Sequence, residues 1–147
     1  MYKYCLGNES TGGTGAMAHE NPLRVATEHA QAGRTAEAIA CLELELARTR
    51  SSAERPANVP ILAKTAGLLC EQSGTLQRAA HYYEEAVAVG DPDPLTLVAL
   101  ADVHWRLGRA DSAVSCLTRA ESLAKSSSDA DTLTVIANMR ARWASGP

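Results

Sequence analysis

The spacing of apolar residues along the chain predicts a series of short amphipathic helices. Ala38, Ile39, Leu42 and Leu46 recur at the three- and four-residue intervals that place side chains on one helix face. Similar runs are separated by Gly, Pro, Ser and Asp, which end and begin helices. A first helix is expected from residue 22 to about 32 and a second from about 35 up to a connector at 49–58. One helical hairpin is expected from 60 to about 89 with a break at 73–74, another from 95 to about 125 with a break at 108, and a seventh helix at about 130–144.

The pattern repeats itself at an offset of 34 residues. Gly74 corresponds to Gly108, and Ala79 corresponds to Ala113. Further matched pairs are Ile61 with Leu95, Ala66 with Leu100, Gly67 with Ala101, Tyr83 with Leu117 and Ala86 with Ala120. A repeat of this length is typical of stacked helix pairs, because each pair can bury its apolar side only against a neighbour. The chain is predicted to be an all-α solenoid of three antiparallel helix pairs, closed by a seventh, capping helix.

Composition changes divide the chain into a lead-in and one domain. Residues 1–18 are Gly-rich with few apolar anchors, so a flexible N-terminal segment is expected there. Residues 19–145 are expected to form a single domain, with repeats at about 19–52, 60–93 and 94–127 and a capping helix at 130–144. The polar connector at 49–58 lengthens the first repeat, which costs little free energy in a loop.

The repeated positions resemble the tetratricopeptide repeat, whose pattern combines a turn glycine with small residues at fixed places. The third unit shows this resemblance through Leu100-Ala101, Gly108, Ala113, Leu117 and Ala120. The second unit shows it through Ala66-Gly67, Gly74, Ala79, Tyr83, Ala86 and Asp91-Pro92, and the first through Val25-Ala26, Gly33, Ala38 and Leu42. The resemblance implies a right-handed solenoid whose first helices line a concave groove. It also implies that Ala38, Ala79 and Ala113 mark the closest approach of paired helices.

By this resemblance, the groove would bind another protein or a peptide. Its expected lining is Leu23, Thr27, Ile61, Lys64, Leu68, Glu71, Leu95, Val98, Asp102 and Trp105. Much of this set is apolar, which suits an amphipathic helix or an extended apolar peptide. Trp105 is the strongest candidate anchor, and the alternative is that the last helix covers it. Some relatives grip a C-terminal carboxylate with Lys, Asn and Arg, but the matching places here hold side chains that cannot do so.

Three interpretations of the function remain open at this stage. The first is a small adaptor of bacterial type that holds another polypeptide. The second is a self-associating structural or chaperone-like protein, with a homodimer as one form. The third is a regulatory domain of a larger system.

Charge and cysteine usage narrow the class of partner. The formal net charge is −3 and no basic stripe occurs, so nucleic acid is not expected as a partner. No apolar run reaches the roughly 20 residues of a membrane helix, so a membrane partner is not expected either. The four cysteines are widely scattered, which favours reduced thiols and a cytoplasmic location.

No residue pattern predicts an enzyme or a cofactor. Residues 13–18 fit G-x-G-x-x-A, but that motif binds nucleotides only within a βαβ unit. His29, Cys70 and His104 fall at equivalent places in successive pairs, and adjacent helices lie too far apart for them to share a metal ion. We therefore expect no catalytic residues, no metal and no cofactor.

Overall fold

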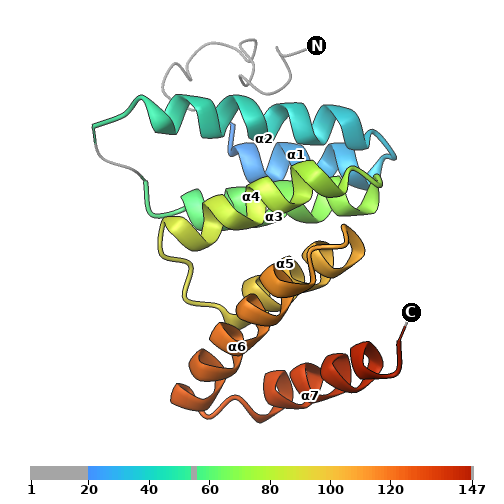
Figure 1. Cartoon of the computed structure of the whole chain (residues 1–147). Coiled ribbons are helices and arrows are strands. Elements are labelled where there is room, and N and C mark those ends of the chain that lie inside the picture. The colour runs from blue at the N-terminus through green and yellow to red at the C-terminus, as the bar shows by residue number, and fades with distance from the viewer. Residues whose placement is uncertain (1–19, 54–55, 147) are drawn as a thin grey trace, which may run out of the picture.

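The computed structural model describes residues 20–53 and 56–146, and within these ranges every regular element is a helix. The seven helices form a stack that runs from α1 to α7 (Figure 1). Their bounds are α1 Pro22–Gln31, α2 Thr35–Arg50, α3 Val59–Gln72, α4 Leu76–Ala88, α5 Pro94–Arg106, α6 Ala110–Ser126 and α7 Ala130–Ala144. The expected helices are confirmed to within about two residues at each end. The predicted flexible segment 1–18 lies outside the described residues.

Three helices begin at side chains that cap their free N–H groups. The side-chain oxygens of Asn21, Asp93 and Asp129 each accept a hydrogen bond from a backbone N–H two or three residues further on, at 2.9 to 3.0 Å. Pro22 and Pro94 follow two of these caps in the first turn, where a missing N–H costs nothing. These caps place the starts of α1, α5 and α7.

The first helix of each pair ends in the same left-handed turn. Gly33, Gly74 and Gly108 have φ of 82°, 84° and 80°. In each case the N–H of the next residue bonds back to the carbonyl five residues earlier, at 2.8, 2.9 and 2.8 Å. This Schellman arrangement satisfies carbonyls that the helix end leaves open. At the end of α6 the same conformation is held by Ser128, with φ of 56°.

These turns predict opposite effects for two exchanges. Gly108→Ala should lower the free energy of unfolding by about 1–2 kcal/mol, because a left-handed backbone is strained for a residue with a Cβ. A Cβ at Gly108 would have no neighbour within 4 Å, so the cost is conformational and not steric. Ser128→Gly should raise the stability by about 1 kcal/mol for the same reason. Urea unfolding measures both, and a loss of stability in Ser128→Gly would contradict this account.

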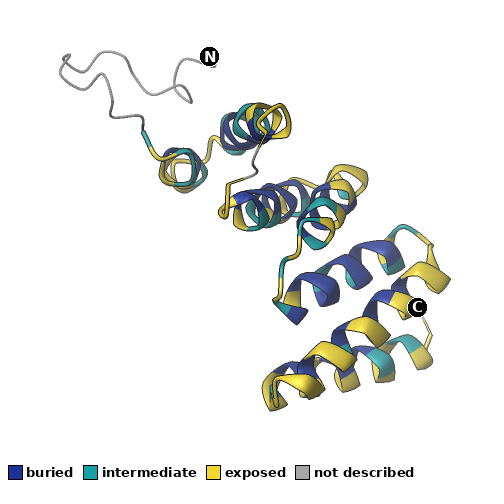
Figure 2. Cartoon of the chain, turned by 90° about the vertical axis from the view of Figure 1, so that its left-hand side faces the viewer, coloured by how far each residue is buried: buried dark blue, intermediate teal, exposed yellow. Residues whose placement is uncertain are grey.

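The helices pack as three antiparallel pairs with one extra helix. α1 packs on α2, α3 on α4 and α5 on α6, while α2–α3, α4–α5 and α6–α7 contacts join the pairs. Ala38, Ala79 and Ala113 are completely buried at the second helices of the three pairs, as the repeat predicts. The buried surfaces face one another along the stack, and the exposed surfaces face outward (Figure 2). Among the described residues, no helix is both long enough and apolar enough to span a bilayer.

Candidate partner-binding face

Three large apolar side chains are exposed on the first helices of the second and third pairs. Ile61 and Leu68 of α3 are 46% and 47% exposed, and Leu95 of α5 is 47% exposed. Ile61 and Leu95 occupy equivalent places, each at the same distance before the turn glycine of its pair. We call the exposed side of α1, α3 and α5 the first-helix face. Apolar side chains that recur on one face are typical of a surface that is covered by a partner.

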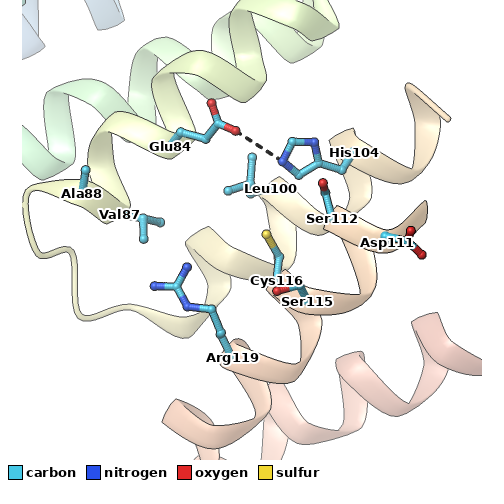
Figure 3. Close-up of a pocket in the computed structure, with 10 residues that line it drawn as sticks. All are labelled: Glu84, Val87, Ala88, Leu100, His104, Asp111, Ser112, Ser115, Cys116 and Arg119. Carbon is cyan, nitrogen blue, oxygen red and sulfur yellow. Dashed lines mark ion pairs between the residues drawn. The ribbon is translucent and has the colours of Figure 1, made fainter. Parts of the chain in front are cut away.

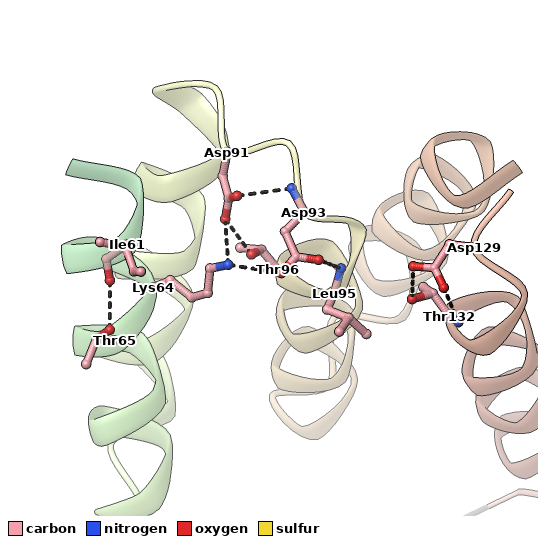
Figure 4. Close-up of polar contacts among 9 residues, drawn as sticks. All are labelled: Ile61, Lys64, Thr65, Asp91, Asp93, Leu95, Thr96, Asp129 and Thr132. Carbon is pink, nitrogen blue, oxygen red and sulfur yellow. Dashed lines mark hydrogen bonds and ion pairs between the residues drawn. The ribbon is translucent and has the colours of Figure 1, made fainter. Parts of the chain in front are cut away.

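Polar contacts at the start of α5 tie it to α3 on this face. The Lys64 Nζ atom lies 3.4 Å from an Asp91 carboxylate oxygen and 3.1 Å from one of Asp93 (Figure 4). Asp91 also accepts hydrogen bonds from the hydroxyl of Thr96 at 2.5 Å and the backbone N–H of Asp93 at 3.0 Å. Burial lowers the pKa of Lys64, but the hydrogen bond with Asp93 and the two carboxylate charges outweigh it and raise the pKa overall. Lys64 is therefore a fixed cation between two acids.

A second cluster joins the far ends of the same two helices. Glu71 of α3 accepts a hydrogen bond from the hydroxyl of Tyr83 at 2.9 Å and pairs with Arg106 of α5 at 2.8 Å. Arg106 also lies 3.4 Å from Asp102. Burial and the Glu71 carboxylate raise the pKa of Tyr83, so its hydroxyl keeps its proton and its role as donor. Ion pairs therefore tie α3 to α5 at both ends.

Only some of the ten residues that were expected to line the groove are exposed to solvent. Thr27, Ile61, Leu68 and Leu95 are exposed, and Leu23, Lys64, Glu71, Asp102 and Trp105 are half-buried. Val98 is 7% exposed and belongs to the hydrophobic core, so its inclusion among the surface residues does not fit the structure. The repeat places Val98 level with Lys64, at the border between surface and core. A lysine there can extend its ammonium group to solvent and to acids, but a valine stays buried.

Trp105 is stacked on a side chain of the last helix. Its ring and that of Trp143 are nearly parallel, with centroids 4.5 Å apart and an angle of 8° between planes. Both side chains are half-buried. The sequence left open whether Trp105 meets a partner or the last helix, and α7 provides the neighbour. Trp105 is therefore partly covered by α7 and is not a fully available anchor for a partner.

The third helix pair resembles a known repeat family. Residues 96–127, which cover nearly all of α5 and α6, match the tetratricopeptide repeat family model. This match and the seven helices fit a tetratricopeptide-like repeat protein. No curated protein matches it. Tetratricopeptide repeats are protein-interaction modules, so the coarse functional class is that of a protein-binding scaffold.

The tetratricopeptide-like pairs also enclose a cleft on the side away from the first-helix face. It lies between α4, α5 and α6 and has a volume of about 600 Å3. Figure 3 shows Glu84, His104, Ser112, Cys116 and Arg119 around it. The sequence did not indicate this cleft, because its lining comes from three helices that are distant along the chain.

His104 is the least satisfied polar side chain near this cleft. Its side chain is 6% exposed, its Nε2 lies 3.5 Å from Glu84, and its Nδ1 has no hydrogen-bond partner. At the equivalent place in the first pair, Arg34 donates to the Nδ1 of His29 at 3.0 Å. In the third pair the corresponding residue, Arg109, instead donates to the side chain of Gln77 at 2.7 Å. Because Arg109 bonds to Gln77 and not to the histidine, the Nδ1 atom of His104 has no hydrogen-bond partner.

The environment of His104 predicts a pH dependence of stability. Burial lowers its pKa below 6.5, the nearby Arg109 guanidinium lowers it further, and the Glu84 carboxylate only partly opposes them. The unfolded chain therefore takes up this proton at higher pH than the folded one does, so stability falls as pH drops below about 7. Urea titrations between about pH 7.5 and pH 5.5 should show this slope, and His104→Gln should reduce it. An equal slope in His104→Gln and wild type would contradict the prediction, and His81→Gln at an exposed site is the control.

The other sequence candidates for chemistry do not gather into a site. His29, Cys70 and His104 lie on three different first helices, each near the turn of its own pair. Within residues 20–53 and 56–146, no group of three or more His, Cys, Asp or Glu side chains is arranged to hold a metal ion. The G-x-G-x-x-A stretch at 13–18 lies outside the described residues.

Proposed function

We propose that this protein is a non-catalytic adaptor that binds a segment of another polypeptide across the first-helix face. The observation that carries the proposal is the exposure of Ile61, Leu68 and Leu95 on two adjacent first helices. The remaining large aliphatic side chains of α3 and α5 are buried, so these three are exceptions to an otherwise efficient core. Their aliphatic character suits the apolar stripe of an amphipathic helix or an extended apolar peptide.

The exposed apolar residues of the second helices support this choice of face by contrast. Val114 and Leu123 of α6 are 52% and 39% exposed. They lie two and a half helical turns apart, so they point in opposite directions and form no strip. Single exposed apolar residues are ordinary on protein surfaces. The same contrast makes Val114 a matched control for Leu68.

Self-association is the alternative, and the Trp143 contact counts against it. Trp143 is the large aromatic side chain of the last helix and would suit a dimer contact, but its ring is stacked on Trp105 of the same chain. We also infer a cytoplasmic location. Cys70 and Cys116 are free thiols and are buried, which suits a compartment that keeps thiols reduced.

The proposal is tested with peptides selected for binding from a displayed library of amphipathic sequences. Leu68→Glu should weaken binding of a selected peptide by about tenfold or more, because a charge in the centre of an apolar contact loses more than 1 kcal/mol. Val114→Glu should leave binding within about twofold. Fluorescence anisotropy measures both affinities. Equal losses in the two variants, or a dimer in light scattering that Leu68→Glu converts to a monomer, would contradict the adaptor.

A further inference from the structure

One charge arrangement recurs three times on the first-helix face. Helices α1, α3 and α5 contain one Lys or Arg each, and each of these cations lies between two carboxylates. The groups are Arg24 with Glu20 and Glu28, Lys64 with Asp91 and Asp93, and Arg106 with Glu71 and Asp102. Each group therefore carries one uncompensated negative charge.

The second helices are charged differently. Taken with their N-caps Arg34 and Arg109, helices α2, α4 and α6 contain seven acids and seven Lys or Arg residues, so their charges balance. Their ion pairs are largely one to one, as in Arg50 with Glu85 at 2.5 Å and Arg78 with Glu43. At the α6–α7 contact the pattern is inverted, because Glu121 lies between Lys125 at 3.4 Å and Arg140 at 3.0 Å. Counted in the same way with their N-caps, helices α1, α3 and α5 contain four acids and three Lys or Arg residues, and Glu20 and Asp91 just before two of these caps add two further acids. The acidic surplus therefore lies on the side of the first helices.

This arrangement selects the charge of a partner. An acidic segment on this face would find each cation already paired with two carboxylates. It would also be repelled by the surplus of negative charge. A Lys or Arg at the same place would meet the more exposed carboxylate of each group, which is Glu28, Asp93 or Asp102, whereas Asp91 is buried against Lys64 and Thr96. Lys64 lies between Ile61 and Leu68 in the sequence of α3, and Asp93 caps the helix that presents Leu95. The group around Lys64 therefore borders the exposed apolar residues.

We propose that the segment bound here is an amphipathic helix with Lys or Arg residues flanking its apolar stripe. This inference rests on the proposed function and adds the chemistry of the partner. The apolar stripe would cover Ile61, Leu68 and Leu95. The flanking cations would lie against the three acidic groups, which supply orientation and association rate more than total affinity.

Two synthetic 18-residue peptides test this inference directly. They share one leucine stripe and differ only in having Lys or Glu at the flanking positions. In about 50 mM NaCl the Lys peptide should bind the full chain at least tenfold more tightly. That advantage should shrink several-fold in about 300 mM NaCl, because salt screens exposed charges.

Matched variants separate a local effect from the net charge of the protein. Asp102→Asn on the first-helix face should weaken the Lys peptide severalfold, whereas Asp111→Asn on α6 changes the net charge equally and should have little effect. Equal binding of both peptides that Leu68→Glu abolishes would overturn the charge inference and leave the proposed function intact. Binding that Leu68→Glu does not affect would overturn both.

Discussion

Replacing Gly67 with alanine should destabilise the protein by about 1–3 kcal/mol, although the same exchange in most helices is stabilising by about 1 kcal/mol. A Cβ at Gly67 would lie 2.8 Å from two ring carbons of Tyr83, closer than real contacts allow. The ring cannot move away easily, because Tyr83 is 2% exposed and its hydroxyl is bonded to Glu71. Urea unfolding of Gly67→Ala measures the effect.

The third pair supplies the control for this prediction. Ala101 and Leu117 occupy there the places that Gly67 and Tyr83 occupy in the second pair, and both are buried. The second pair combines glycine with the large tyrosine ring, whereas the third pair combines the slightly larger alanine with the smaller leucine. In a Tyr83→Leu background, Gly67→Ala should become neutral or stabilising. The same loss in both backgrounds would show that α3 and α4 do not meet at these residues.

Replacing Trp143 with alanine should cost about 2 kcal/mol and loosen α7 from the stack. Complete burial of a tryptophan is worth about 3–5 kcal/mol, and this side chain is half-buried. Stacked aromatic pairs contribute about 0.5–1.5 kcal/mol beyond their buried area. The loss should appear as a lower melting temperature and as faster hydrogen exchange in α7.

The Trp pair also gives a spectroscopic signal of its own. Trp105 and Trp143 are the only two tryptophans of the chain, so coupling between their rings should be visible in circular dichroism. Trp143→Ala should remove this signal, whereas Trp143→Phe should retain most of the stability and α7 protection. A Trp143→Ala variant with unchanged stability and spectrum would mean that α7 is held by other contacts.

The helix pairs could be predicted from sequence because their signals are local. Gly33, Gly74 and Gly108 stand where a left-handed backbone is required, and Asn21 and Asp93 stand where helices need caps. Such requirements depend on a few neighbouring residues. The family match at residues 96–127 and the seven helices confirm the repeat architecture.

The composition of the candidate face could be predicted only in part, because it depends on contacts between distant residues. The 34-residue period places Val98 and Lys64 at one position, but it does not reveal that the valine is buried there and the lysine is not. The ion pairs of Arg106 with Glu71 and of Lys64 with Asp93 span 35 and 29 residues. The cleft beside His104 and the stacking of Trp105 likewise require three-dimensional placement.

The helix pairs bury one another and, by our proposal, leave the first-helix face to a partner. The most direct test is a residue-resolved NMR titration of the labelled chain with the Lys-flanked amphipathic peptide. We expect the largest shift changes in α3 and α5, around Ile61, Leu68 and Leu95, with α4 and α6 little affected. Changes centred on α4 and α6, around the cleft beside His104, would contradict it.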